Sequence, residues 1–232
     1  MKRAIILAGG KGTRLKPYTI SLPKPLVPIG NTPILEIIVR QLKRCDFTHI
    51  TLTVNHMADI IQAFFGDGSK WGIKIDYSLE GTALSTMGPL TLINDLPDNF
   101  LVMNGDVLTD LDFDKFYSEH ENSGSNFTIA AHKRIDRVEY GVLITNENSQ
   151  LVDFKEKPVN HYLVSMGVYM VNKKNLAYIP KDTFFGFDHL MNALIKDGKY
   201  PSIKEYSGYW LDIGRPADYE KAVEEFEKIS FL

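Results

Sequence analysis

The chain has 232 residues and a formal net charge of −3, from 26 basic and 29 acidic side chains. This balance argues against a dedicated nucleic-acid-binding protein, whose binding face is usually strongly basic. A content of 44% hydrophobic and 24% charged residues is typical of a folded globular protein. The single cysteine, Cys45, excludes an intramolecular disulfide and a zinc site made of cysteines.

The first apolar run of the chain, Ala4 to Ala8, ends at Gly9. It is too short for the hydrophobic region of a signal peptide or for a membrane span. A short continuous apolar run is typical of a strand that is buried on both faces of a sheet. We therefore expect a soluble cytoplasmic protein that binds neither membranes nor nucleic acid.

The first 125 residues predict strands and helices in alternation. Strands are expected at 4–7, 49–54, 73–77 and 100–103, and helices at 33–45, at 58–65 and from about residue 85. Such alternation indicates parallel strands with helices on both faces of the sheet. Asp110 or Asp112 could cap a further helix after the last of these strands.

After about residue 126 the pattern changes to successive strands separated by turns. Strands are expected at 127–133, 142–145, 151–154 and 164–171, followed by a helix at 187–196, a strand near Ile203 and a last helix at 216–229. This order indicates a mixed or antiparallel extension of the sheet. The sequence contains no internal repeat and no linker-like stretch, so one domain over residues 1–232 is expected.

A glycine-rich loop, Leu7–Leu15, follows the first strand. Glycines allow several backbone N–H groups to approach one anion, so the loop is a candidate phosphate-binding site. It matches neither standard phosphate loop, because Gly12 follows Lys11 where the Walker pattern needs Ser or Thr, and Leu15 replaces the third glycine of the dinucleotide fingerprint. A tight connection without a ligand is the alternative.

Basic residues lie in this loop and shortly after it in the sequence. Lys11 and Arg14 lie in it, and Lys24 stands between Pro23 and Pro25. The two prolines restrict the backbone, which lowers the entropy cost of aiming the Lys24 ammonium group. These cations and the glycines could together clamp a polyphosphate, although a solvated basic loop is the alternative.

Two aspartates follow strand-like segments. Asp106 comes just after the buried strand 100–103, and Asp212 comes just after Tyr209–Leu211. Ligands bind at the carboxyl ends of strands in open α/β sheets, so both aspartates are candidate metal ligands. For each of them, a turn or capping residue at a strand end is the alternative.

The glycine-rich loop and Pro23–Leu26 resemble the signature of sugar-1-phosphate nucleotidyltransferases. The similarity continues, in the order of that family, through Asn104–Asp106, Tyr140–Val142, Phe154–Pro158, Met166–Tyr169 and Trp210–Gly214. The resemblance implies an α/β, Rossmann-like nucleotidyltransferase fold, in which helices flank a mixed, mostly parallel sheet with a smaller antiparallel sugar-binding extension. Within the single domain, a nucleotide-binding part over about 1–125 and a sugar-binding part over about 126–232 are implied.

The family reaction uses a nucleoside triphosphate, a sugar 1-phosphate and Mg²⁺. In-line attack at the α-phosphorus gives a nucleoside diphosphate sugar and pyrophosphate. The attacking phosphate oxygen is already ionised at neutral pH, so no general base is required, and the sequence offers no convincing Ser-His-Asp or Cys-His arrangement. Positioned cations, and a metal ion held by one or two carboxylates, supply what this chemistry needs.

The resemblance also implies roles for individual residues. The nucleotide would be held by Leu7, Ala8, Gly9, Gly10, Lys11, Gly12, Thr13, Arg14, Glu80, Ser85, Thr86, Asn104, Gly105 and Asp106. The sugar phosphate would be held by Tyr140, Gly141, Glu156, Lys157 and Gly167, and Mg²⁺ by Asp106 and Asp212. Arg14, Lys24 and Lys157 would be catalytic, through their charge at the reacting phosphates.

Glu80 favours GTP as the nucleotide. Its carboxylate offers two acceptors to the N1–H and N2–H₂ donors of guanine, whereas uracil and thymine present an acceptor–donor–acceptor edge that suits an amide. The segment from Glu80 to Leu90 resembles that of guanylyltransferases of the family, and the compact length of the chain resembles bacterial guanylyltransferases for mannose, heptose or amino-sugar 1-phosphates. The segment departs from their pattern at Ala83, Ser85 and Met87, which replace a proline, a glycine and a small residue.

These departures leave other functions open. A CTP- or UTP-dependent enzyme that acts on a sugar or another small phosphate is one alternative, and a catalytically silent nucleotide-sugar sensor is another. The sugar itself is not identified, since Ser165 and Met166 replace the residues common before Gly167 in hexose enzymes. A homodimer is possible.

Overall fold

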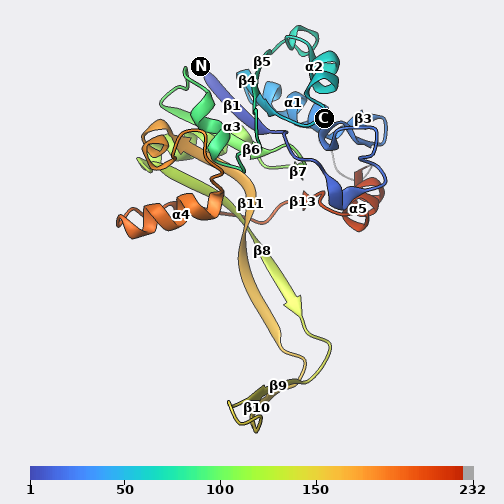
Figure 1. The fold of residues 1–232 in the computed structure, drawn as a ribbon, viewed down its shortest axis with the longest axis vertical. Helices are drawn as coiled ribbons and strands as arrows, with labels where there is room; N and C mark the ends of the chain where they lie inside the picture. The colour runs from blue at the N-terminus through green and yellow to red at the C-terminus, as the bar shows by residue number, and fades with distance from the viewer. Residues whose placement is uncertain (227–232) are drawn as a thin grey trace.

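The computed structural model describes residues 1–226 (Figure 1). Its centre is a seven-stranded sheet in the order β12-β8-β11-β6-β1-β4-β5. The strands are β1 (Lys2–Leu7), β4 (Phe47–Val54), β5 (Lys74–Leu79), β6 (Asn99–Asn104), β8 (Phe127–Arg137), β11 (Val159–Asn172) and β12 (Ser202–Tyr206). Neighbouring strands are parallel except where β11 pairs with β6 and β8. The predicted mixed, mostly parallel sheet is therefore confirmed.

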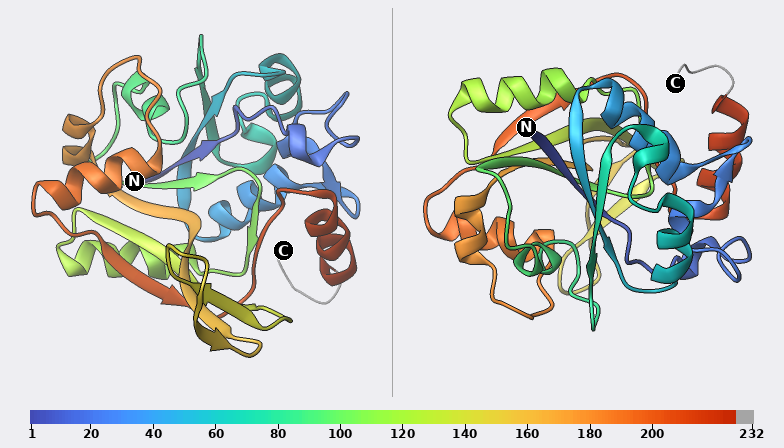
Figure 2. Two further views of the ribbon diagram at one scale, coloured as in Figure 1. Left: turned by 60° about the horizontal axis from the view of Figure 1, so that its bottom comes forward. Right: turned by 90° about the horizontal axis from the view of Figure 1, so that it is seen from above.

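Helices lie on both sides of this sheet (Figure 2). They are α1 (Ile34–Arg44), α2 (Ala58–Phe65), α3 (Phe113–Ser123), α4 (Phe187–Lys196) and α5 (Pro216–Phe226). Alternate residues of β1 face opposite cores, because Ala4 and Ile6 join the cluster that includes α1 and α3, whereas Ile5 joins the cluster with Leu190 of α4. None of the helices within residues 1–226 is long and apolar enough to cross a membrane.

One predicted helix is wrong. From about residue 85 the chain forms only a short 3-10 helix, Gly88–Leu92. Ser85 has a φ of 66°, in the left-handed region that a right-handed helix cannot use, and Pro89 lacks the N–H that an α-helix would need further along. The last residues of the predicted helix 216–229 lie outside the described residues.

The helix expected after residue 112 is confirmed as α3. Asp112 is its N-cap, and its carboxylate accepts a hydrogen bond from the Lys115 N–H at 3.0 Å. Such a cap satisfies one of the backbone donors that the first turn of a helix leaves without a partner.

Two short strand pairs lie beside the main sheet. One joins β2 (Pro28–Ile29) to β3 (Thr32–Pro33), and the other joins β7 (Val107–Thr109) to β13 (Trp210–Asp212). The antiparallel register of the second pair sets Asp212 opposite Val107. This pairing brings together two parts of the chain that are more than 100 residues apart.

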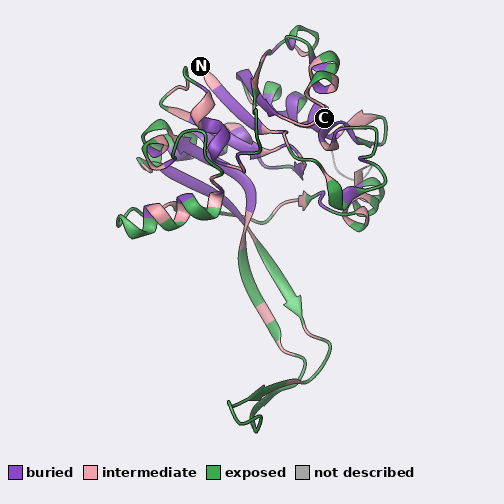
Figure 3. Cartoon of the chain, in the orientation of Figure 1, coloured by how far each residue is buried: buried purple, intermediate pink, exposed green. Residues whose placement is uncertain are grey.

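Beyond the sheet, β8 and β11 continue as a two-stranded ribbon, from the pair Lys133 and Leu163 to the pair Arg137 and Val159. The ribbon leads to a separate hairpin of β9 (Val142–Thr145) and β10 (Leu151–Lys155). We call residues 132–165 the arm and the other described residues the body. The arm projects away from the body, and none of its residues is buried (Figures 1 and 3).

Candidate active site

The glycine-rich loop leaves β1 at the carboxyl edge of the parallel strands. The Ala8 N–H donates a hydrogen bond to the Thr53 carbonyl of β4 at 2.9 Å. The Gly105 N–H, just after β6, donates to the Leu7 carbonyl at 3.0 Å. The loop is therefore held between the ends of β4 and β6, which is where open α/β sheets bind ligands.

Gly12 turns the chain within this loop. It has a φ of 61°, and a Cβ at this position would lie 2.9 Å from Thr19 Cγ2 and 3.0 Å from Lys24 Cβ. The Thr19 hydroxyl also donates a hydrogen bond to the Gly12 carbonyl at 2.8 Å. Glycine is the residue that accommodates both this conformation and this close approach.

We expect Gly12→Ala to lower the free energy of unfolding by at least about 1–2 kcal/mol, because an alanine in the left-handed conformation costs that much before any contact is displaced. Urea denaturation would measure the loss. Gly10→Ala is the matched control, since a Cβ on Gly10 would have nothing within 4 Å and its φ is not positive. Equal stability of the two variants would contradict this explanation.

Lys24 and Asp106 form an ion pair at the end of the loop. Lys24 begins a short 3-10 helix directly after Pro23, and its ammonium group contacts the carboxylate of Asp106, which is 82 residues away in the sequence. The side chains are 11% and 21% exposed, so both charges are largely removed from solvent. This contact brings the two residues together at the end of the loop, and their roles stay predictions.

Asp212 lies next to Asp106. The Ile213 N–H donates a hydrogen bond to the Asp106 carbonyl at 3.0 Å, which ties the end of β13 to the start of β7. The Asp212 side chain is reached by solvent, but desolvation by the surrounding atoms raises its pKa, and the Asp106 carboxylate raises it further. The positive charges of Lys24 and Arg14 act on the Asp212 pKa in the opposite direction.

The Arg14 guanidinium group lies near Asp212, and both side chains lie beside Gly214. A Cβ placed on Gly214 would lie 3.7 Å from Asp212 Oδ2 and 4.0 Å from Arg14 Nη2. Four of the residues predicted from the sequence, Arg14, Lys24, Asp106 and Asp212, therefore converge beside the glycine-rich loop. Two cations and two carboxylates at one strand edge can hold a polyphosphate together with a divalent ion.

Asp106 and Asp212 fit a Mg²⁺ site. The Oδ1 atom of Asp106 is buried and has no hydrogen-bond partner. Mg²⁺ is usually held by one or two carboxylates and completes its shell with waters and substrate phosphates. Residues 1–226 contain no cluster of three His, Cys, Asp or Glu side chains that could hold a metal ion. The donor set thus suits an ion shared with a bound phosphate.

Glu80 directly follows β5 and faces the glycine-rich loop. Its N–H donates to the Val54 carbonyl at 2.9 Å, and its carbonyl accepts a hydrogen bond from Asn55 Nδ2 at 2.8 Å. The Oε2 atom accepts from the Leu84 N–H at 3.1 Å, whereas Oε1 would lie 2.8 Å from a Cβ on Gly9. Burial raises the pKa of Glu80. The carboxylate is therefore fixed, with Oε1 beside the loop.

The conformation of the segment after Glu80 explains how two of its unusual residues, Ser85 and Met87, are accommodated. Ser85 adopts the left-handed conformation that a glycine would adopt without strain. Met87 is fully buried in the core cluster that contains Ile5, so it does not fill the space beside the loop. Thr86 Oγ1 accepts a hydrogen bond from the Phe187 N–H at 2.7 Å, at the start of α4. The nucleotide contacts expected of Ser85 and Thr86 stay predictions.

Gly167 is part of the body and lies beside the end of β6. It has a φ of 73°, and a Cβ there would lie 2.6 Å from Asn104 Nδ2. The Trp210 indole N–H donates a hydrogen bond to the neighbouring Met166 carbonyl at 2.9 Å. One member of the predicted sugar-binding set thus lies next to the predicted nucleotide-binding residues.

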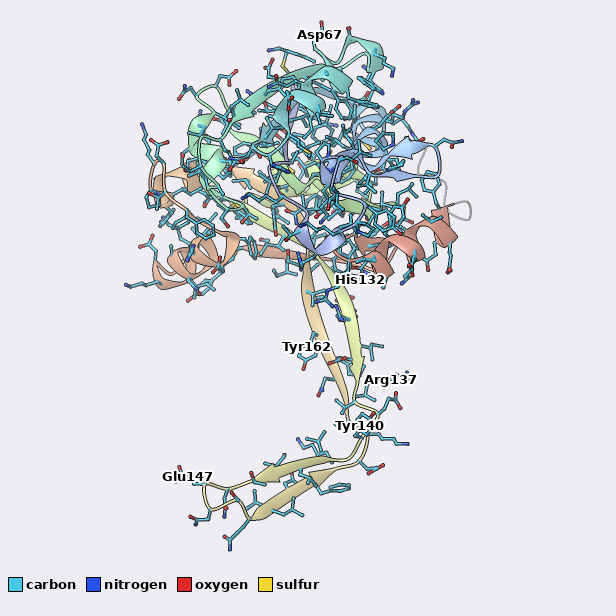
Figure 4. All side chains as sticks on the ribbon, turned by 45° about the vertical axis from the view of Figure 1, so that its right-hand side comes forward. Asp67, His132, Arg137, Tyr140, Glu147 and Tyr162 are labelled. Carbon is cyan, nitrogen blue, oxygen red and sulfur yellow. The ribbon has the colours of Figure 1, made fainter. Side chains whose placement is uncertain are left out.

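The other four members, Tyr140, Gly141, Glu156 and Lys157, lie on the arm (Figure 4, where Tyr140 is labelled). A Cβ on Gly141 would lie 2.6 Å from the Phe154 ring and 3.2 Å from Glu156 Oε2, so the set is gathered at one place. Lys157 has a φ of 43° immediately before Pro158. The expectation that Lys157 joins Arg14 and Lys24 is not met within one chain, because the ribbon runs away from the body.

Asn55 and Asp218 belong to the site but were not predicted. Asn55 directly follows β4, so the rule for strand ends could have found it. Asp218 lies in the first turn of α5, with Oδ2 3.6 Å from the position of a Cβ on Gly214. The same oxygen accepts a hydrogen bond from the Arg215 N–H at 2.9 Å, which orients it.

The chain is similar to known proteins over most of its length. A family model described as Nucleotidyl transferase matches residues 3–229. A UTP–glucose-1-phosphate uridylyltransferase from Synechocystis sp. is 32% identical, and a mannose-1-phosphate guanyltransferase beta-A from Xenopus laevis is 35% identical. The alignments cover 95% and 94% of this chain but 62% of each relative, so the chain spans only part of the length of these curated proteins.

Two solved structures are similar to nearly the whole chain. One is a Bacillus anthracis protein given the provisional description of glucose-1-phosphate thymidylyltransferase, in complex with a sucrose. It has a TM-score of 0.79 and 27% sequence identity, and the match covers 100% of this chain and 98% of that chain. The other is HddC from Yersinia pseudotuberculosis complexed with GMP-PN, with a TM-score of 0.72 and 29% identity over 97% and 100%.

Proposed function

Because the chain belongs to the nucleotidyl transferase family, we propose that it transfers a nucleoside monophosphate from a nucleoside triphosphate to a sugar 1-phosphate. The observation that carries this proposal is the convergence of Arg14, Lys24, Asp106 and Asp212 beside the glycine-rich loop. The names of both curated relatives contain a sugar 1-phosphate, which supports this class of acceptor.

In this reaction an oxygen of the sugar phosphate bonds to the α-phosphorus. The bond from that phosphorus to the oxygen shared with the β-phosphorus breaks, and pyrophosphate leaves with the electron pair. The loop N–H groups bind the triphosphate, while Lys24 and Arg14 orient it and balance the charge on the leaving group. Asp106 and Asp212 would hold Mg²⁺, which when bound supplies further positive charge to the phosphates.

We propose GTP as the nucleotide. The fixed Glu80 carboxylate beside Gly9 presents acceptors that match the adjacent donors of guanine. The guanyltransferase relative and the GMP-PN complex of HddC support this choice. The uridylyltransferase and thymidylyltransferase descriptions of the other two proteins make a pyrimidine nucleotide the second candidate.

Pyrophosphate release from each nucleoside triphosphate, with a panel of sugar 1-phosphates and Mg²⁺, tests both proposals. We expect release with GTP and at least one sugar 1-phosphate. Release with UTP or TTP alone would overturn the choice of base and leave the reaction type standing. Nucleotide binding without release from any combination would favour a silent nucleotide-sugar sensor.

We expect Glu80→Gln to lower the preference for GTP over UTP, as the ratio of kcat/KM values, by roughly 10-fold or more, because a mispaired polar group in a binding site costs about 1–3 kcal/mol. Steady-state kinetics with both nucleotides would measure this ratio. Glu224→Gln makes the same chemical change on an exposed residue of α5 and should leave the ratio unchanged. An unaltered ratio in Glu80→Gln would remove this residue from base recognition.

A further inference from the structure

The arm exposes apolar surface that its own chain does not cover. Leu143 and Leu151, on the strand pair at its tip, are 64% and 59% exposed, and Phe154 and Leu163 are also exposed. An isolated two-stranded hairpin is at best marginally stable in water, and contiguous exposed apolar surface marks an interaction site. The arm therefore needs a surface to pack against.

The total surface of the chain is larger than that of a compact monomer of the same mass. The chain exposes 12396 Å², whereas a compact monomer of 26.3 kDa exposes about 10,600 Å². The excess is roughly 1,800 Å², within the roughly 1,000–2,500 Å² that each chain buries in a large obligate homodimer interface. A projecting arm produces such an excess, and a second copy that covered this area would form an interface of the size found in stable dimers.

The predicted site is divided between the body and the arm. Arg14, Lys24 and Asp106 lie on the body, whereas Glu156 and Lys157 lie on the arm. Lys157 adopts a φ of 43°, a conformation that side-chain-bearing residues rarely take and that is often kept at functional sites. The body contains the nucleotide-binding residues and Gly167, whereas the two charged residues expected at the sugar phosphate lie on the arm.

The base of the arm is fixed, which disfavours folding back onto its own body. The irregularity in β11 between Ser165 and Tyr169 is held by a hydrogen bond of 3.0 Å from the Ser165 hydroxyl to the Tyr169 hydroxyl. Met166 accepts the indole hydrogen bond of Trp210, and Gly167 is packed against Asn104. Beyond this base, the pairing is continuous as far as Arg137 and Val159, so the ribbon has no break at which to reverse.

The arm also leaves the body close to the catalytic edge of the sheet, because Gly167 at its base contacts Asn104 at the end of β6. Two copies related by a twofold axis, with these edges facing each other, could therefore each extend an arm along the site of the other. In such an arrangement both copies use the same surfaces, so the assembly stops at two copies.

We propose that two copies of this chain exchange arms, so that Glu156 and Lys157 of one copy complete the sugar-phosphate site on the body of the other. The proposal rests on the proposed function for the role of these residues. It differs from a simple dimer because each site is incomplete without the second copy.

Mixing two inactive variants tests the exchange. Lys24→Met disables the body and Lys157→Met disables the arm, so each variant alone should release almost no pyrophosphate. When the two are refolded together, about half of the dimers should be mixed, and one site in each mixed dimer should unite an intact body with an intact arm. Activity should then reach about a quarter of the wild-type value. Activity no higher than the sum of the separate variants would overturn the exchange and indicate closure within one chain.

The molar mass in solution tests the proposal without any activity. Light scattering should give a dimer for the wild type and a shift towards monomer for the double variant Leu143→Glu/Leu151→Glu. Ile195→Glu, at an exposed apolar position of α4, is the control and should remain a dimer. A monomeric wild type, or a dimer that the double variant leaves intact, would overturn the exchange. A wild-type dimer that the double variant disrupts, but that releases no pyrophosphate with any substrate, would overturn only the proposed function.

Discussion

Asp106→Asn is expected to lower kcat by on the order of 10²–10³-fold, the loss found when one preorganised group that stabilises transition-state charge is removed. The buried Oδ1 atom of Asp106 has no hydrogen-bond partner in the protein, and its position beside Asp212 suits a shared divalent ion. Asparagine keeps an oxygen acceptor for Lys24 but loses the negative charge that Mg²⁺ requires.

The measurement is pyrophosphate release at saturating substrates over a range of Mg²⁺ concentrations. Circular dichroism and urea unfolding should show that Asp106→Asn retains the fold, since the amide can still accept a hydrogen bond from Lys24. Asp59→Asn, an exposed position at the start of α2, provides the matched control and should turn over like the wild type. Near-normal turnover in Asp106→Asn would exclude this residue from the metal site.

The place of Asp106 in the fold could be predicted from the sequence. The apolar runs of β1 and β6 are buried on both faces, so they are distinct enough to fix where each strand ends. A residue just after such an end lies at the ligand-binding edge of the sheet. The same argument placed the glycine-rich loop and would also have placed Asn55.

The approach of Asp212 to Asp106 could not be predicted from strand patterns. It depends on the pairing of β7 with β13, each of three residues, which is too short to show a periodic pattern. The resemblance to a family implies that both aspartates bind Mg²⁺. The structure shows that the register of this strand pair brings them close together.

The direction in which the arm leaves the sheet could not be predicted from the sequence either. Residue patterns predict that 127–133 and 164–171 are strands, and both lie within longer strands of the structure, β8 and β11. A pattern of this kind shows which residues pair across a ribbon but not whether the ribbon packs on its own sheet or leaves it. Exposed apolar residues such as Leu163 are the signal that only coordinates reveal.

Lys24→Met should lower kcat by a similar factor, on the order of 10²–10³, because it removes a fixed charge from the triphosphate. Methionine preserves the length and apolar stem of lysine, so the packing of Lys24 against Gly12 is retained. Lys174→Met, on an exposed lysine, is the control and should have wild-type kinetics. A kcat within a few-fold of the wild type in Lys24→Met would show that the ammonium group does not act on the reacting phosphates.

Combining the two substitutions tests whether Lys24 and Asp106 act as one unit. The two groups contact each other and would serve the same phosphates, one directly and the other through the metal ion. Residues that act together lose less when both are removed than the product of their separate losses predicts. We therefore expect Lys24→Met/Asp106→Asn to be scarcely slower than the slower single variant. Fully multiplicative losses would mean that the two charges act independently, and the ion pair would then be a structural contact of the resting protein.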